Sequence, residues 1–233
     1  MNQEIILILF QVLVLVLAFS VHESAHAYVA MRLGDPTAYM LGRVTLNPIR
    51  HLDPLGSVLV PLISLVYGGW LIGWAKPCPV TLRNFKNIRR DDILTSLAGP
   101  ASNLAMALIA LIMLIVFKHL VPGGAPAIGA AQYLATGGSG IDTAHQPILF
   151  PFALLFYFMV LINLSLFIFN LIPIPPLDGS HVLRNFLSPR LEAIYNQVGR
   201  FGLILMFLVG GRLIMPYFYY PLLNVFDGVL AVL

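Results

Sequence analysis

Charged residues are scarce in this 233-residue sequence. They make up only 10% of it, whereas 59% is hydrophobic and the mean hydropathy is +0.88. Soluble domains usually carry about 25% charged residues. With so little charge, the chain cannot cover a water-facing exterior, so its composition predicts an all-α polytopic protein embedded in a lipid bilayer.

Cysteine is almost absent, because Cys78 is the only one in the sequence. A single cysteine excludes an internal disulfide and a zinc site built from several thiolates. No polybasic run with interleaved aromatic residues occurs, which argues against a nucleic-acid partner. The first residues lack the positive charge and small-residue cleavage site of a secretory signal, so we expect this segment to be retained.

Long apolar runs separated by proline and glycine predict about 4–6 membrane helices in one domain covering residues 1–233. Breaks such as Gly34-Asp35-Pro36 and Pro173 mark the ends of these runs. We expect spans near 5–33, 93–117, 148–172 and 199–215, with another at 217–232 if Pro216 divides the last segment. Between the first two full spans, residues 39–46 are candidate short strands, and 57–73 is a candidate re-entrant hairpin.

The sequence His22-Glu23-Ser24-Ala25-His26 places two histidines four residues apart near the end of the first span. Residues at this spacing share one face of a helix, so both imidazoles can bind one zinc ion while Glu23 acts as general base. The alternative is a pair of surface histidines. A glutamate in lipid costs about 2–3 kcal/mol, which favours the functional interpretation.

A catalytic zinc ion usually has three protein ligands, and Asp178 is the candidate for the third. It follows Pro173, Pro175 and Pro176 at the broken end of the third expected span. Irregular backbone at membrane depth is tolerated where it lines a cavity or is buried in protein. The alternative role for Asp178 is to cap the helix that starts near His181.

The distribution of cations predicts the orientation. If 57–73 enters and leaves on one side, Asp178 reaches the side of His26, and eleven of the thirteen Lys and Arg residues lie there. If that segment crossed the membrane completely, five Lys and Arg residues would lie on the side of His26 and eight on the other side. Asp178 would then lie on the side opposite His26. The positive-inside rule therefore favours a cell-membrane protein with its N-terminus outside and the site near the cytosolic face.

The zinc motif, the stretch Ala98-Gly99-Pro100-Ala101-Ser102-Asn103 and the stretch from Asn170 to Gly179 together resemble the site-2 protease family of intramembrane zinc metalloproteases. Residues 73–80 resemble a loop of its small prokaryotic members, without PDZ or CBS domains. The resemblance covers roughly residues 18–190. It implies one Zn²⁺ per chain, held by His22, His26 and Asp178, with Glu23 as the catalytic glutamate.

The resemblance also implies that the chain cleaves single-span membrane proteins within or near a transmembrane segment, and that Asn170 contacts the substrate backbone. An interhelical hydrogen bond is the alternative role for Asn170. We expect Asn103 to serve packing and His181 to begin a helix. A metal-ion transporter and a catalytically silent scaffold are the competing functions, although the paired repeats common in transporters are not found. The sequence does not define an oligomeric state.

Overall fold

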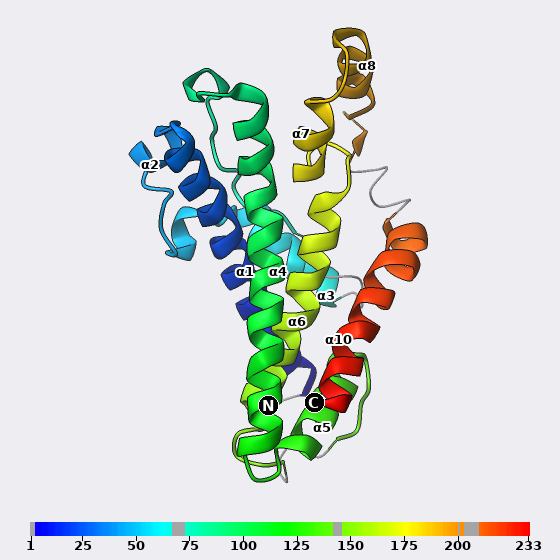
Figure 1. Ribbon diagram of the computed structural model, residues 1–233. Helices are drawn as coiled ribbons and strands as arrows, with labels where there is room; N and C mark the ends of the chain where they lie inside the picture. The colour runs from blue at the N-terminus through cyan, green and yellow to red at the C-terminus, as the bar shows by residue number, and fades with distance from the viewer. Residues whose placement is uncertain (1–2, 67–72, 142–145, 200, 203–209) are drawn as a thin grey trace.

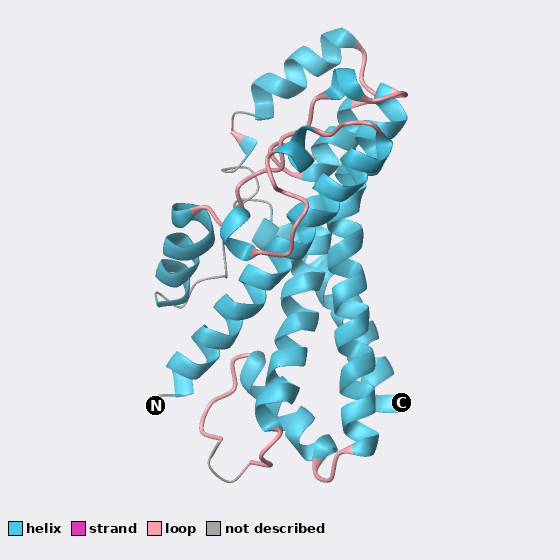
Figure 2. Cartoon of the chain, turned by 90° about the vertical axis from the view of Figure 1, so that its left-hand side faces the viewer, coloured by secondary structure: helices cyan, strands magenta, loops and turns pink. Residues whose placement is uncertain are grey.

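The computed structural model describes residues 3–66, 73–141, 146–199, 201–202 and 210–233. Over these residues the fold is all-helical, as Figure 2 shows, and this confirms the predicted all-α class. Three helices are long and apolar enough to cross a membrane: α1 (Gln3–Leu33), α4 (Ile88–Leu120) and α6 (Phe150–Leu171). The expected count of 4–6 spans is therefore not confirmed over the described part of the chain.

Helix α4 packs along both α1 and α6 and forms the centre of the bundle (Figure 1). Its alanines Ala107 and Ala110 are fully buried, as is Ala153 on α6. Small side chains let helix backbones approach closely, which is how membrane helices gain packing contacts without a hydrophobic driving force in lipid. Helix α5 (Gly124–Ala135) packs against α6 at the end of the bundle where both termini lie.

The expected strands at 39–46 are not found. Residues Thr37–Met40 form the short helix α2, and the chain then turns at Gly42, whose φ is +67°. Proline at position 36 precedes α2, where its fixed φ suits a helix start, and a glycine with positive φ interrupts an extended run. The short helices η1 (Pro48–Arg50) and η3 (Leu82–Asn84) complete this region without any strand between residues 3 and 66 or 73 and 87.

The expected re-entrant segment begins with helix: η2 (Pro54–Leu59) continues into α3 (Val60–Val66). Residues 67–72 lie outside the described residues. Trp74 N donates to Gly56 O over 3.0 Å, and Ser57 Oγ donates to Trp74 O over 2.7 Å. These bonds hold the start and the end of the segment side by side. Its depth in a membrane stays a prediction.

The C-terminal region begins with α7 (Asp178–Arg184) and α8 (Pro189–Gly199). Much of the expected span at 199–215 falls outside the described residues. The next helices, η5 (Gly210–Tyr219) and α10 (Tyr220–Val232), form one helical run through Pro216. The condition for a separate span at 217–232, a break at Pro216, is therefore not met.

Candidate metal centre

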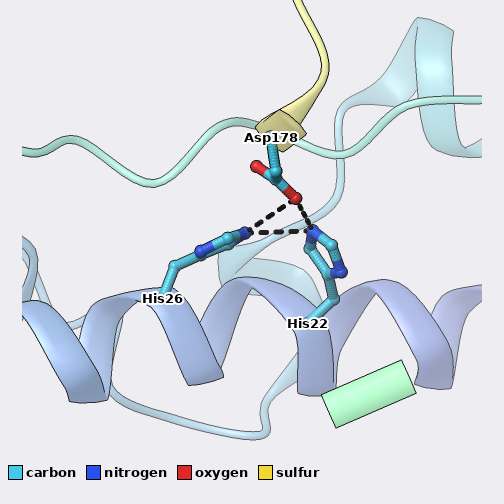
Figure 3. Close-up of side chains that lie close together, drawn as sticks. All are labelled: His22, His26 and Asp178. Atoms are coloured by element: carbon cyan, nitrogen blue, oxygen red, sulfur yellow. Dashed lines mark hydrogen bonds and ion pairs between the residues drawn. The ribbon is translucent and has the colours of Figure 1, made fainter. Parts of the chain in front are cut away.

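Three side chains from two distant parts of the sequence point toward one another (Figure 3). His22 and His26 lie one turn apart on α1, and Asp178 is the first residue of α7. The two Nε2 atoms are 3.0 Å apart. Asp178 Oδ2 lies 3.1 Å from His22 Nε2 and 3.3 Å from His26 Nε2.

The end of α6 determines where Asp178 lies. Helix α6 ends at Leu171, and the proline-rich segment that follows leads directly into α7. Next to Asp178, Gly179 lies so close to the preceding chain that a β-carbon would be 2.3 Å from Leu171 O. Only glycine allows this approach of backbone to backbone. The Pro-rich break and Gly179 together bring the carboxylate back toward α1.

The donor set fits a zinc ion. Two ligand atoms at 2.0–2.2 Å from a tetrahedral zinc lie about 3.3–3.5 Å apart, close to the separations found here. Asp178 Oδ2 is buried and has no hydrogen-bond partner among the described residues. A buried carboxylate oxygen beside two imidazole nitrogens is stabilised when a cation lies between them, so the arrangement indicates a metal site.

Both imidazoles are oriented through their other nitrogen. His22 Nδ1 lies 2.6 Å from Asn103 Oδ1, and His26 Nδ1 lies 2.7 Å from the carbonyl oxygen of Thr95. Each contact places an acceptor against Nδ1, so Nδ1 carries the proton and Nε2 is free to bind metal. Metal-binding histidines are commonly held in this way, and the partner fixes the tautomer and the ring orientation.

Gly99 of α4 completes the walls of this site. A β-carbon at position 99 would lie 2.3 Å from His26 Nε2 and 2.6 Å from His22 Nε2. At position 99 the space that a methyl group would fill is the space next to the metal-facing nitrogens.

Glu23 lies next to His22 on α1 and is 8% exposed. Its Oε2 is buried without a hydrogen-bond partner among the described residues. Glu23 lines the same cavity as the two histidines and Asp178. The chain therefore places a carboxylate without a fixed hydrogen bond beside the donor set, as a general base requires.

The centre opens into a cavity of about 1000 Å³. Its walls come from α1, α6, α7 and the extended residues 73–82, including Trp74, Pro77 and Val80. Most of this lining is apolar, and the polar groups gather near the donor set. A cavity of this size and lining is suited to a largely apolar ligand.

Asn170 lies on the last turn of α6 and lines this cavity. Its Nδ2 donates to Leu166 O over 3.0 Å, a bond within its own helix. The interhelical bond considered as its alternative role is not found among the described residues. An asparagine amide has two N–H groups and an oxygen, so the side chain keeps further hydrogen-bonding capacity for a ligand in the cavity.

His181 and Cys78 also line the cavity. Burial lowers the pKa of His181, and the neighbouring Arg184 guanidinium lowers it further. Burial raises the pKa of Cys78 to about 12, and the charge of Glu23 adds to this effect. The thiol therefore stays protonated at neutral pH, which argues against a thiolate nucleophile at this position.

Asp92, near the start of α4, holds the C-terminal end of α7 against α4. Its Oδ2 accepts a 2.6 Å hydrogen bond from Asn185 Nδ2 and lies 3.5 Å from the guanidinium of Arg184. Asp92 is 4% exposed, so these contacts satisfy a buried charge. They fix the far end of the short helix that begins with Asp178.

Sequence reasoning assigned Asn103 to packing and did not single out Thr95 or Asn163, which also support the site. A polar side chain inside an apolar span is a signal of function or of interhelical bonding. Asn103 and Asn163 each carry that signal, but their partners lie 81 and 60 residues away in sequence and required the three-dimensional arrangement. Thr95 acts through its backbone carbonyl, which no residue pattern shows.

Comparison with known proteins identifies the family. The family model described as peptidase family M50 matches residues 10–209. This chain belongs to peptidase family M50. A Bacillus subtilis protein named "Putative zinc metalloprotease YwhC" is 38% identical to this M50 peptidase over 91% of the chain and 85% of the relative.

Two mycobacterial relatives share the name "Putative zinc metalloprotease Rip2". The protein of Mycolicibacterium smegmatis is 27% identical over 82% of the chain, and that of Mycobacterium tuberculosis strain H37Rv is 29% identical over 81%. The chain spans 62% and 61% of their lengths. No solved structure matches the M50 peptidase. The family and these names imply a membrane metalloprotease that uses zinc.

Proposed function

We propose that this M50 peptidase is a zinc-dependent endopeptidase that cleaves membrane-anchored proteins within or near a transmembrane segment. The observation that carries the proposal is the convergence of His22 Nε2, His26 Nε2 and Asp178 Oδ2 within 3.3 Å of one another. The two histidines of this donor set lie on α1, a helix apolar enough to cross a membrane, and the donor set opens into a mostly apolar cavity.

In this proposal His22, His26 and Asp178 hold one zinc ion. When bound, the ion would supply a Lewis acid for the scissile carbonyl and lower the pKa of water toward about 7. Asn103 and Thr95 keep the two Nδ1 atoms protonated, so both Nε2 atoms stay available as ligands. Gly99 leaves room beside them.

Glu23 is the proposed general base. Its carboxylate takes a proton from the attacking water and can return that proton to the amine of the leaving peptide. Oε2 has no hydrogen-bond partner among the described residues, so no bond to the protein has to break before it accepts the proton. The burial of Glu23 keeps bulk water from competing for this position.

The proposed substrates are single-span membrane proteins. A helix hides its carbonyl groups, so the substrate has to unwind locally before hydrolysis. The non-helical segment from Trp74 to Val80 lines the cavity. The backbone groups of Trp74 itself are bonded to Gly56 and Ser57, so the proposed edge for an unwound peptide lies in the residues that follow it. The amide of Asn170, at the other wall, is the proposed contact to the substrate backbone near the scissile bond.

We also propose that the N-terminus lies outside the cell and the metal centre near the cytosolic face. Both termini lie at one end of the bundle, and α2, α7 and α8 lie at the other (Figure 1). In the topology predicted from the sequence, eleven of the thirteen Lys and Arg residues belong to that opposite end. The positive-inside rule places this end in the cytosol.

The decisive experiment compares the wild type with Glu23→Gln on a panel of single-span proteins in detergent. Zinc content is measured in both by elemental analysis. We expect the wild type to yield products cut within or near the membrane segment, and Glu23→Gln to retain zinc without cutting. Glu192→Gln, a change at an exposed carboxylate on α8, is the matched control and should cut normally.

Cleavage retained in Glu23→Gln would contradict the role of this glutamate. Zinc flux into liposomes without any cut product would favour the transporter instead. A wild-type protein that binds zinc stoichiometrically, loses it in His22→Ala and yet cuts none of the panel would favour the silent scaffold.

A further inference from the structure

A chain of side-chain hydrogen bonds runs from α6 through α4 to the metal centre on α1. Asn163 Nδ2 donates to Met159 O over 2.9 Å, and Asn103 Nδ2 donates to Asn163 Oδ1 over 2.9 Å. Asn103 Oδ1 then lies 2.6 Å from His22 Nδ1. Both asparagines are fully buried. Asn163 is therefore linked to His22 through Asn103, and none of its own hydrogen bonds goes to His22, His26 or Asp178.

The carbonyl oxygen of Met159, at the α6 end of this series of hydrogen bonds, determines which group donates and which accepts in every one of them. Met159 O is a backbone carbonyl and can only accept, so Asn163 must turn its N–H₂ toward it. Asn163 Oδ1 then faces Asn103, which must donate in turn. Turning either amide over would place two acceptors or two donors 2.9 Å apart in a buried site.

These directions determine the tautomer of His22. Since Asn103 uses its N–H₂ on Asn163, it presents Oδ1 to the imidazole, and His22 Nδ1 must carry the proton. Nε2 is then a free lone pair aimed at the metal position. The other tautomer would present an N–H there. His26 differs, because its Nδ1 is held directly by the fixed carbonyl of Thr95.

We propose that Asn103 and Asn163 are positioning residues that set the metal-binding tautomer of His22 before the metal arrives. The inference rests on the proposed function, in which His22 is a zinc ligand. It assigns a role in zinc affinity to Asn163, which contacts α4 and its own helix rather than any of the three ligands. If Asn163 is lost, Asn103 can turn over and the tautomer of His22 is no longer fixed.

The test uses three variants. Asn163→Leu removes the end of the chain at similar volume and should weaken zinc binding about 10- to 100-fold, as expected for partners of metal-binding histidines. Tyr157→Phe is the matched control, because it breaks another buried interhelical bond of α6, from Tyr157 OH to Asp227 Oδ1, away from the cavity. It should leave zinc affinity unchanged.

The third variant separates positioning from packing. In Asn103→Asp combined with Asn163→Leu, both carboxylate oxygens accept, so His22 again meets an acceptor whichever way the side chain is turned. We expect this double variant to regain most of the zinc affinity lost in Asn163→Leu. A packing role alone predicts a further loss, because the double variant buries a charge beside an apolar side chain.

Zinc affinity is measured by competition with a chelator. The tautomer of His22 is determined by ¹⁵N NMR of the metal-free protein. We expect one tautomer in the wild type and the double variant, and a mixture in Asn163→Leu. An unchanged tautomer or unchanged zinc affinity in Asn163→Leu would overturn the inference. Failure of the proposed function is distinguishable, because it would show as a wild type that binds no zinc, whatever the tautomer.

Discussion

Gly99 and His26 lie so close that a single added carbon atom would overlap the metal-facing nitrogen. A β-carbon on Gly99 would be 2.3 Å from His26 Nε2. Atoms in van der Waals contact are separated by about 3.5–4.0 Å, so one of the two helices or the imidazole would have to move. The backbone of α4 thus forms one wall of the metal centre, and the choice of glycine is a property of the site.

We expect Gly99→Ala to weaken zinc binding strongly while leaving the fold intact. Alanine favours an α-helix by about 1 kcal/mol over glycine, so α4 itself is not weakened. The displaced imidazole nitrogens should reduce zinc affinity by about 100-fold or more. The measurement is zinc content by elemental analysis, with thermal unfolding in detergent as the test of folding.

Gly129→Ala is the matched control for this prediction. Gly129 lies within α5, and a β-carbon there would meet no atom within 4 Å. This variant should keep its zinc and its activity. If Gly99→Ala bound zinc as tightly as Gly129→Ala does, the close approach of α4 to the donor set would be wrong.

The three long helices could be predicted because each is a continuous apolar run ended by glycine or proline. Predicted spans at 5–33, 93–117 and 148–172 correspond to α1, α4 and α6 with boundary shifts of a few residues. The histidine pair could also be anticipated, since residues four apart on a helix share a face. These features depend on local sequence alone.

Other features depend on contacts that local sequence does not contain. Residues 39–46 read as strand because of their aromatic and branched side chains, but Pro36 and Gly42 impose a short helix and a turn. Pro216 is a candidate break of the last apolar segment, yet the helix continues through it. The hydrogen bonds of Asn103 and Thr95 to the two histidines join residues 69 to 81 positions apart, so only the packed bundle shows them.

The second prediction concerns Asn170, whose side chain lines the cavity and is bonded to its own helix. We expect Asn170→Ala to lower kcat by about 100-fold, the cost of losing one donor that stabilises a transition state. Zinc content should not change, because Asn170 makes no hydrogen bond to His22, His26 or Asp178.

A structural role for Asn170 predicts a different result. Thr136→Ala is the control, since Thr136 Oγ1 also donates to the carbonyl four residues earlier, Gln132 O, but on α5 outside the cavity. If both variants lost a similar amount of stability and neither changed kcat, Asn170 would be assigned to the structure of α6. A kcat loss confined to Asn170→Ala would assign it to the reaction.

The third prediction concerns Asp35, which fixes the far end of the cavity-lining segment 73–82. Asp35 is fully buried just after α1, and its carboxylate accepts hydrogen bonds from Thr81 N over 2.7 Å and Asn84 Nδ2 over 2.8 Å. Burial alone would raise the pKa of Asp35, but these bonds and that of Thr37 outweigh it, so its pKa lies below the ordinary value.

A carboxyl group with a lowered pKa stabilises the fold when it is ionised. The contribution of Asp35 is therefore complete above the pKa of the unfolded chain, about 3.9, and is lost as the pH falls through the lower pKa of the folded state. We expect Asp35→Asn, which turns an N–H₂ toward one of these donors, to lower the unfolding free energy at pH 7 by about 1–3 kcal/mol.

The measurement is the midpoint of thermal unfolding in detergent between pH 7 and the most acidic pH at which the protein stays soluble. The difference between wild type and Asp35→Asn should be largest at neutral pH and should shrink as the wild-type carboxylate is protonated. Asp53→Asn is the comparison, because Asp53 also accepts from backbone N–H groups, those of Leu55 and Gly56, but within its own turn. A difference that stayed constant with pH would show that ionisation of Asp35 does not hold this segment in place.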